Sequence, residues 1–313
     1  MRDKNRRQTL LIEAPVKINL HLQIIGRRPD GYHDLDSLML KLQLADQLRL
    51  TLRDNESLNL VCLGADLPED ETNLAFRAAL VFLRENSISQ GVDIELNKKV
   101  PVAAGLGGGS SDAAAVLLGL NELHQSHLPE EKMLAMARQL GADVSFFIIN
   151  SVAARAEGVG DRLTPVTMQD DFRVLLVNPG FPVSTRWAYE NFALTTADNP
   201  YILGRHLNNR GKVDIFALDD ASRLANDLES VTIGRFPEIG MIKKELLADG
   251  AEIALMTGSG PTVFGLFLVP EKAARSQEQF QQRYGDNVFL TRPLLPKASR
   301  LSPPPQVGDY NAG

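Results

Sequence analysis

The chain has 313 residues, which is too many for one typical hydrophobic core and suits two folded domains that share a cleft. Its 44% of apolar and 23% of charged residues match ordinary globular proteins and exclude a disordered or fibrous class. The net charge of -6 argues against a nucleic-acid partner, because such proteins carry a basic surplus. No apolar run approaches the roughly 18 residues that cross a bilayer, so we expect no membrane span. The single cysteine, Cys62, cannot form an intramolecular disulfide, which favours a reducing cytoplasm.

The first half of the chain mixes strand and helix patterns. From residue 16 to 22 apolar residues alternate with Lys17, Asn19 and His21, which predicts a strand with one buried and one polar face. The further elements predicted in this half are a turn at 30–31, a strand region at 38–52, a helix at 73–84, a strand at 92–96, helical spacing at 116–123 and a helix at 130–140.

The pattern restarts after residue 161, so we place a domain boundary near residue 160. Because strands and helices mix without a regular βαβ repeat, the predicted fold class is α+β. The domains are then 1–160 and 161–290, and residues 291–313 form a flexible tail that contains three consecutive prolines. The elements predicted in the second domain are a strand at 174–177, helices at 222–228 and 239–247, and a hairpin of 253–256 with 263–268.

The segment from residue 101 to 113 is the most informative part of the sequence. Four glycines in five positions lead into two serines and an Ala-rich helix. Glycine lets backbone N–H groups surround phosphate oxygens, and a helix N-terminus adds unpaired N–H groups and partial positive charge, so we expect a nucleoside triphosphate. The alternative is a flexible linker, and Lys98 and Lys99 either approach the nucleotide or form a charged turn. The predicted nucleotide-binding residues are Lys98, Lys99, Pro101, Val102, Ala103, Ala104, Gly105, Leu106, Gly107, Gly108, Gly109, Ser110 and Ser111.

This segment resembles the central motif of the GHMP kinases, P-x-x-x-G-L-G-x-x-S-S. Segments 14–20, 141–147 and 256–265 resemble the other motifs of that superfamily in the expected order, over roughly residues 11–270. The resemblance implies a two-domain GHMP kinase fold, with an N-terminal ATP-binding and catalytic domain, a C-terminal domain and the active site in the cleft between them. It also implies ATP as phosphoryl donor, with Mg²⁺ bound to the ATP. The turn at 257–262 is expected to pack against the Gly-rich segment or to be a plain hairpin turn.

Three further segments resemble one branch of the superfamily, the diphosphocytidyl-methylerythritol kinases. They are DGYH at 30–33, NPGFPVSTRWAY at 178–189 and NDLE at 226–229. The branch phosphorylates the tertiary 2-hydroxyl of a methylerythritol linked to cytidine diphosphate, so the implied partners are that small molecule and ATP.

The resemblance implies roles for two charged residues. Asp143 is the base that accepts the hydroxyl proton, and the alternative for this residue is a helix N-cap after Gly141. Lys17 is its partner and counters charge on the transferring phosphoryl group, whereas a lone strand lysine is usually only solvated. Ser145 departs from the branch, which has a proline there, so the turn that carries Asp143 is less constrained.

Substrate recognition is expected to involve two aromatic rings that enclose the cytosine and a histidine that pairs with its edge. For the tyrosines the alternative is packing at the domain interface, and Trp187 competes with Tyr189 as the stacking ring. The predicted substrate-binding residues are Asn19, Tyr32, His33, Asp143, Thr185 and Tyr189.

Two other functions stay open at this point. One is a GHMP kinase for another small alcohol of the homoserine or mevalonate type, because the Gly-rich segment is common to all of them. The other is a catalytically silent relative that only binds nucleotide. The segment DGYH and Tyr189 favour the cytidine substrate over the first, and the presence of both Lys17 and Asp143 argues against the second.

Overall fold

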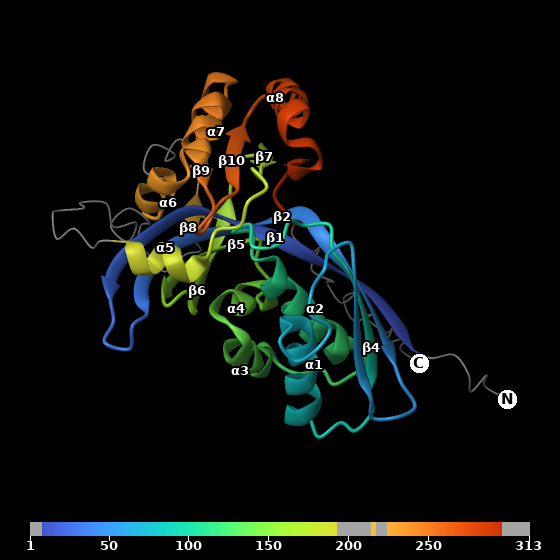
Figure 1. Ribbon diagram of the computed structural model, residues 1–313. Helices are drawn as coiled ribbons and strands as arrows, with labels where there is room; N and C mark the ends of the chain where they lie inside the picture. The colour runs from blue at the N-terminus through green and yellow to red at the C-terminus, as the bar shows by residue number, and fades with distance from the viewer. Residues whose placement is uncertain (1–7, 193–213, 217–223, 296–313) are drawn as a thin grey trace, which may run out of the picture.

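The computed structural model describes residues 8–192, 214–216 and 224–295 of the chain. Two sheets and two groups of helices stack in layers (Figure 1). The elements are β1 (Thr9–Arg27), β2 (His33–Leu52), β3 (Leu58–Leu63), α1 (Leu74–Glu85), β4 (Val92–Asn97), α2 (Gly108–Leu123), α3 (Glu130–Leu140), α4 (Ala142–Ile148), β5 (Ala153–Gly158), β6 (Arg162–Met168), β7 (Arg173–Val177), α5 (Thr185–Asn191), β8 (Asp214–Phe216), α6 (Glu229–Arg235), α7 (Pro237–Ala248), β9 (Ile253–Met256), β10 (Val263–Phe267), α8 (Pro270–Tyr284), the short 3-10 helix η3 (Gly285–Asn287) and β11 (Val288–Thr291).

The first sheet is built around the long antiparallel pair β1 and β2. Its strand order is β3-β4-β2-β5-β6-β8, with β1 paired to β2. The predicted turn at 30–31 joins the pair, and there Gly31 has φ 88° and the backbone N–H of Tyr32 donates to Asp30 Oδ1 at 3.1 Å. A positive φ of this size suits glycine, which lacks a Cβ.

Helices α1, α2, α3 and α4 cover one face of the first sheet (Figure 1). Helix α1 begins where the sequence predicts, because the side chain of Asn73 caps it by accepting the N–H of Ala75 at 2.9 Å. Small residues of α2 let it approach the sheet closely, and Ala113 and Val116 have no exposed surface. The large fully buried side chains of this core include Phe82 and Phe146.

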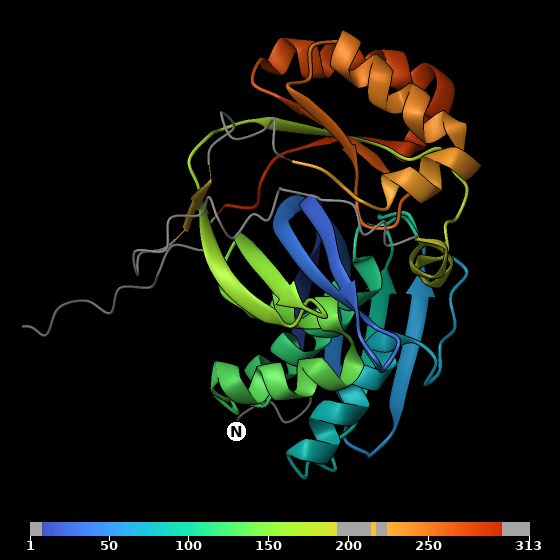
Figure 2. The ribbon, with the colours of Figure 1, turned by 90° about the vertical axis from the view of Figure 1, so that its left-hand side faces the viewer.

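The second sheet has the strand order β11-β7-β10-β9 and packs on the other face of the first sheet (Figure 2). Ile18 and Leu40 of the first sheet share a hydrophobic cluster with Leu176 and Phe264 of the second. Helices α7 and α8 cover the outer face of the second sheet. The predicted α+β fold class is confirmed, as are the strands at 92–96 and 174–177, the helices at 130–140 and 239–247, and the hairpin of β9 with β10.

The polar face predicted for β1 is buried as well. Lys17 is 5%, Asn19 5% and His21 2% exposed. Alternation shows that two kinds of side chain point to opposite faces, but not what covers each face. Here the polar side is closed by α4 at Lys17 and by the N–H of Ala225, which donates to His21 Nδ1 at 3.2 Å.

The predicted helix at 222–228 is wrong over its described part. Leu22 of β1 forms a parallel bridge with Asn226, and the N–H of Asp227 donates to Leu22 O at 2.9 Å. The chain is therefore extended beside β1, and α6 begins only at Glu229. Helical spacing alone does not reveal pairing with a distant strand.

The predicted tail begins too early. Residues 291–294 lie beside β2, where the N–H of Leu294 donates to Lys41 O at 2.9 Å and Leu42 bridges to Pro293. Residues 296–313 lie outside the described part of the chain. The boundary near residue 160 stays a prediction, and the first sheet continues past it because β6 pairs with β5.

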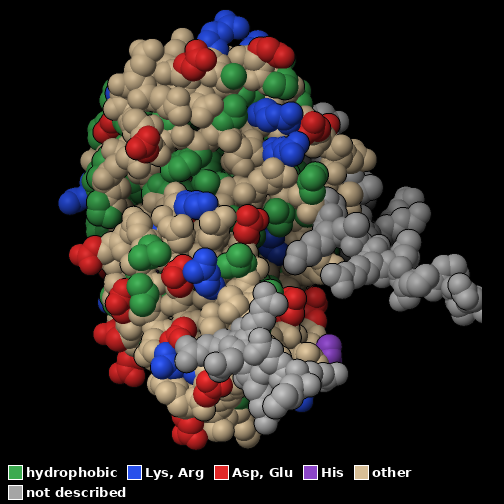
Figure 3. Space-filling view, turned by 90° about the vertical axis from the view of Figure 1, so that its right-hand side faces the viewer, with side chains coloured by type: hydrophobic (Ala, Val, Ile, Leu, Met, Phe, Trp, Pro, Cys, Tyr) green, Lys and Arg blue, Asp and Glu red, His purple; other side chains and the backbone are tan. Residues whose placement is uncertain are grey.

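The surface seen in Figure 3 carries Lys and Arg side chains interspersed with Asp and Glu, so this face has no continuous basic stripe. Among the described residues, every helix is too short or too polar to cross a bilayer.

Candidate active site

A cavity of about 1160 Å³ opens beside the first sheet and is lined by both halves of the chain. Its volume exceeds the range of roughly 300 to 1,000 Å³ for pockets that hold one small ligand, so it has room for two. The segments that line it are 30–33, 101–110, 142–143, 183–186 and 258–259, together with side chains from β1 and β2.

Residues 101–107, which we call the phosphate loop, enter the cavity ahead of α2. Left-handed backbone occurs at Ala103, Gly105 and Gly107, with φ 53°, 77° and 69°. Gly107 is the N-cap of the 16-residue helix α2 and offers no side-chain cap, so the first N–H groups of the helix remain open to an anion. This backbone geometry is compatible with a phosphate cradle, which stays a prediction.

The turn at 257–262 packs against the phosphate loop, which is the first of the two alternatives that the sequence left open. A Cβ on Gly105 would lie 2.3 Å from Thr257 O, which leaves room for glycine only. The hydroxyl of Thr257 also donates to Gly105 O at 3.4 Å. Asn226 holds the turn from behind, because its Nδ2 donates to Met256 O and Gly258 O at 2.7 and 2.8 Å.

Lys17 and Asp143 meet inside the cavity. Lys17 Nζ lies 3.5 Å from Asp143 Oδ2, and the two side chains are 6% and 38% exposed. The ammonium also donates to Asn19 Oδ1 at 2.6 Å, and Asn19 Nδ2 donates to Ser37 Oγ at 2.8 Å. A buried cation is thus held in place while the carboxylate beside it stays open to a ligand.

Asp143 is not the N-cap of its helix. Gly141 occupies that position, and Asp143 lies in the first turn of α4. This overturns the alternative that made Asp143 a structural cap, and it leaves the carboxylate free to point into the cavity. A carboxylate in a first helical turn is also favoured by the helix dipole.

Tyr189 and His33 lie together in the lining of the cavity. Their ring centroids are 5.4 Å apart with an interplanar angle of 32°. Burial, with a smaller contribution from the Asp143 charge, raises the pKa of the Tyr189 phenol above its ordinary range. Burial and the charge of Arg27 lower the pKa of His33. Tyr32 also lines the cavity but is 66% exposed.

The two candidates for a stacking ring are separated by the structure. Tyr189 lines the cavity, whereas Trp187 packs edge-on against Phe236 with a centroid distance of 6.1 Å. Arg235 covers Trp187 at 5.3 Å. Thr185 lines the cavity too, and its hydroxyl lies 2.9 Å from that of Ser259.

Three members of the predicted nucleotide set do not present a free side chain to the cavity. Lys98 lines the cavity, but its ammonium pairs with two buried carboxylates. The Lys99 side chain is exposed and lies outside the cavity lining. Ser111 turns inward, where its hydroxyl donates to Pro15 O at 2.6 Å. Local sequence does not reveal Asp46 as a partner of Lys98 or Pro15 as the acceptor of Ser111, because both lie on distant strands.

Some residues of the cavity carry no motif signal that could have identified them. They come from the segment before α1 and from β1 and β2, and they are Arg27, Ser37, Pro68, Asn73 and Leu74. Ser184, Arg186 and Ser259 also line the cavity and were not predicted, although they lie within the motif segments 178–189 and 256–265 that could have pointed to them.

Comparison with known proteins agrees with this geometry. The chain matches the family model for the GHMP kinases N terminal domain at residues 73–151 and the model for GHMP kinases C terminal at 213–286. It is 44% identical over 274 residues to a 4-diphosphocytidyl-2-C-methyl-D-erythritol kinase of Geobacter sulfurreducens, covering 88% of this chain and 95% of the relative. A kinase of the same name from Desulfotalea psychrophila is 43% identical over 288 residues, covering 90% and 95%.

Solved structures give the same picture. A crystal structure of 4-(cytidine 5'-diphospho)-2C-methyl-D-erythritol kinase matches with a TM-score of 0.75 and 33% identity, over 91% of this chain and 99% of that one. A homoserine kinase from Cytophaga hutchinsonii has a TM-score of 0.69 at 18% identity, over 93% and 95%, which shows the shared fold alone. The chain therefore belongs to the GHMP kinase family, in the branch represented by these 4-diphosphocytidyl-2-C-methyl-D-erythritol kinases.

Proposed function

We propose that this protein transfers the γ-phosphoryl group of ATP to the 2-hydroxyl of 4-diphosphocytidyl-2-C-methyl-D-erythritol, a step in non-mevalonate isoprenoid precursor synthesis. One observation carries the proposal: the charged pair of Lys17 and Asp143 lies in the same cavity as the phosphate loop. The names of the relatives at 43% and 44% identity support the choice of substrate.

In this proposal Asp143 is the general base. Its carboxylate takes the proton of the acceptor hydroxyl while that oxygen bonds to the γ-phosphorus and the bond from phosphorus to ADP breaks. The Lys17 ammonium, 3.5 Å from Asp143 Oδ2, offsets negative charge on the transferring group. Asn19 keeps the ammonium in position by accepting its hydrogen bond at 2.6 Å. Catalysis then comes mainly from positioning and charge, as phosphoryl transfer requires.

The phosphate loop and the first turn of α2 would hold the ATP phosphates through backbone N–H groups. Mg²⁺ bound with the ATP would supply charge neutralisation during transfer. The exposed carboxylate of Asp143 and the hydroxyl of Ser110 both line the cavity, and such oxygen donors fit this ion. These two residues would hold the ion when it is bound with the nucleotide.

The cytidine end of the substrate would bind at Tyr189 and His33. Because these rings contact each other at a centroid distance of 5.4 Å, the base would stack on an outer ring face rather than between them. His33 would then hydrogen-bond the base edge, and Thr185 and Asn19 would contact the polar parts of the substrate.

Two alternatives are less well supported. A kinase for a smaller alcohol without a base would not need the paired rings of Tyr189 and His33 in the cavity lining. A catalytically silent relative that only binds nucleotide would not need a buried ammonium beside an exposed carboxylate. This chain has that arrangement in Lys17 and Asp143. We further propose a cytoplasmic enzyme, since its sequence contains one cysteine and hence no pair for an internal disulfide.

The test is an incubation of the purified chain with ATP, Mg²⁺ and the cytidine substrate, followed by phosphorus and carbon NMR of the product. We expect one ADP per product and a new phosphate monoester on the carbon that bears the 2-hydroxyl. ATP hydrolysis without this ester, or an ester at another carbon, would refute the proposed reaction.

A further inference from the structure

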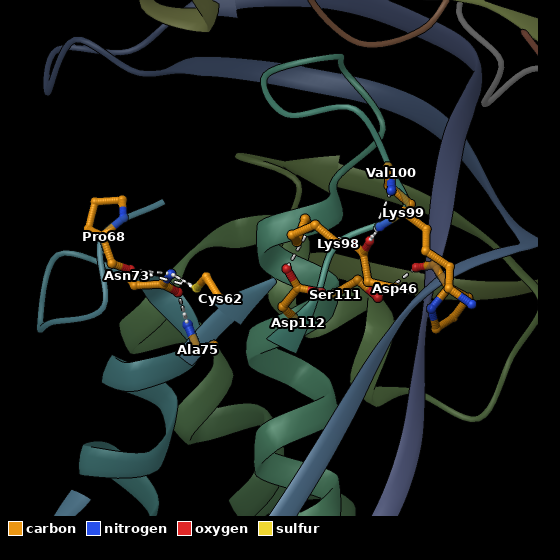
Figure 4. A network of polar contacts seen from close by, with 11 residues as sticks. Asp46, Cys62, Pro68, Asn73, Ala75, Lys98, Lys99, Val100, Ser111 and Asp112 are labelled. Atoms are coloured by element: carbon orange, nitrogen blue, oxygen red, sulfur yellow. Dashed lines mark hydrogen bonds and ion pairs between the residues drawn. The ribbon is translucent and has the colours of Figure 1, made fainter. Parts of the chain in front are cut away.

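A buried cluster of one ammonium and two carboxylates lies behind the phosphate loop (Figure 4). Lys98 Nζ is 2.8 Å from Asp112 Oδ2 and also pairs closely with Asp46. The three side chains are at most 5% exposed. They come from β2, from the residue that follows β4 and from the start of α2.

The cluster binds the backbone just before the phosphate loop. Asp46 Oδ1 accepts the backbone N–H groups of Lys99 and Val100 at 2.6 and 3.0 Å. These two residues directly precede Pro101, so the loop starts from a fixed point on the long strand β2.

The same cluster also includes a residue just after the loop. Asp112 belongs to the beginning of α2, and Lys98 joins it to Asp46. The ammonium also lies against the first residue of that helix, since a Cβ on Gly108 would be 3.3 Å from Lys98 Nζ. Both ends of the seven-residue loop are thus tied to one group of charges.

The electrostatics of the cluster favour a fixed arrangement of its three charged groups. Two carboxylates share one ammonium, and burial raises the pKa of Asp112 to about 7 despite the Lys98 charge. Removing a partner from a buried ion pair leaves an uncompensated charge, so the members hold one another in place. The Lys98 ammonium is paired with the two carboxylates of the cluster. We therefore expect the backbone N–H groups of the loop, and not this ammonium, to bind phosphate.

We propose that Asp46, Lys98 and Asp112 are positioning residues that set the shape of the phosphate loop and thereby the affinity for ATP. Asp46 is the informative member, because it is fully buried and lies outside the cavity lining, so it cannot touch a nucleotide. A loop held ready in its binding shape loses less conformational entropy when the ligand arrives. The inference rests on the proposed ATP site but not on the identity of the acceptor.

The experiment measures the Kd of ATP with Mg²⁺ by calorimetry on the full chain, together with the Kd of the cytidine substrate and the Tm. In Asp46→Ala the N–H groups of Lys99 and Val100 lose their acceptor, while Lys98 and Asp112 remain as a neutral pair that lets the chain fold. We expect the Kd of ATP to rise about tenfold, and that of the cytidine substrate to change less than twofold.

Asp36→Ala is the matched control. Asp36 is also a carboxylate of β2, is 2% exposed, pairs with Arg155 at 2.7 Å and lies outside the cavity lining. We expect this variant to lower the Tm while leaving the Kd of ATP within twofold of the wild type. Equal effects of the two variants on the Kd of ATP would mean that Asp46 is merely structural, and would overturn the inference.

Should Asp46→Ala fail to fold, Asp46→Asn decides the question. It keeps the volume but turns an amide group toward the Lys98 ammonium, so we expect at least a threefold rise in the Kd of ATP; an unchanged Kd in the folded variant overturns the inference. A wild type that binds ATP but does not phosphorylate the cytidine substrate would refute the proposed function and leave this comparison intact.

Discussion

The chemistry of the site depends on how single residues of β1 are aimed. The β1–β2 ladder has register shifts between Pro15 and Lys17 and between Asn19 and His21. Such irregularities bend a strand and redirect side chains next to functional sites. In this chain they bracket Lys17 and Asn19, whose side chains meet at 2.6 Å, although regular alternation alone would only place them on the same face.

Asp143→Asn tests the general base. An amide cannot take up the hydroxyl proton, so we expect kcat to fall by on the order of 10²-fold or more with the Tm and the Kd of the cytidine substrate nearly unchanged. Asp161→Asn, in the turn before β6 and outside the cavity lining, is the control and should keep wild-type turnover. Wild-type kcat in Asp143→Asn would remove this residue from the mechanism.

Tyr189→Ala tests the stacking ring. Loss of base stacking is worth about 1 to 3 kcal/mol, so the KM for the cytidine substrate should rise roughly 5- to 150-fold while the KM for ATP hardly moves. Tyr189→Phe keeps the ring and should stay near the wild type. The opposite pattern, a raised KM in Trp187→Ala but not in Tyr189→Ala, would move the base to the indole.

His21 makes the stability depend on pH. Burial is the main cause that lowers its pKa to about 4, whereas the unfolded value is about 6.5. Below pH 6.5 the unfolded chain binds a proton that the folded chain refuses, so folding stability is lost as the pH falls toward 4. Through His21 the free energy of unfolding falls by about 2 kcal/mol when the pH is lowered from 7.5 to 5. Urea unfolding at both pH values should show this extra loss in the wild type and not in His21→Asn; equal losses in both would contradict the assignment.

At the scale of elements, the phosphate loop is the segment that local sequence describes best. Its glycines can be interpreted from the sequence because glycine favours left-handed backbone, such as the φ of 69° at Gly107, although Gly105 also makes room for the distant Thr257. The buried charges behind the loop cannot be predicted from local sequence, because Asp46 and Lys98 are separated by 52 residues. The same reason explains the misplaced helix at 222–228, where Asn226 bridges to a strand some 200 residues earlier.

Gly107→Ala tests the loop as an element. A Cβ there would lie 3.0 Å from Lys17 Cγ and would occupy a left-handed conformation, so we expect a lower Tm and an ATP affinity reduced by tenfold or more. Gly180→Ala matches the backbone strain, with φ 89°, but has its nearest neighbour at 3.7 Å and lies outside the cavity lining. That control should lose stability and keep its ATP affinity. A folded Gly107→Ala variant with unchanged affinity would show that phosphate binds elsewhere.

At the scale of the whole molecule, the cavity exists because two sheets pack back to back while their loops meet at one side. Lys17 and Asp143 come from the first half of the chain, and Thr185, Tyr189 and Ser259 from the second. The periodic patterns predict the elements of each half, but the meeting of the halves depends on the packing of Ile18 and Leu40 against Phe264, which only the fold reveals. At the level of sequence, only the resemblance to the GHMP kinase motifs predicted that the two halves form a shared cleft.

The central claim is that this cavity phosphorylates an alcohol carried on cytidine diphosphate. The most direct measurement is kcat/KM with ATP for the cytidine substrate beside homoserine and mevalonate, in the wild type and in Asp143→Asn. We expect the cytidine compound to exceed both other alcohols by at least about 10³-fold, because they leave the ring site empty and its stacking and hydrogen bonds unmade. Equal kcat/KM for homoserine or mevalonate, or a wild-type kcat in Asp143→Asn, would contradict the account.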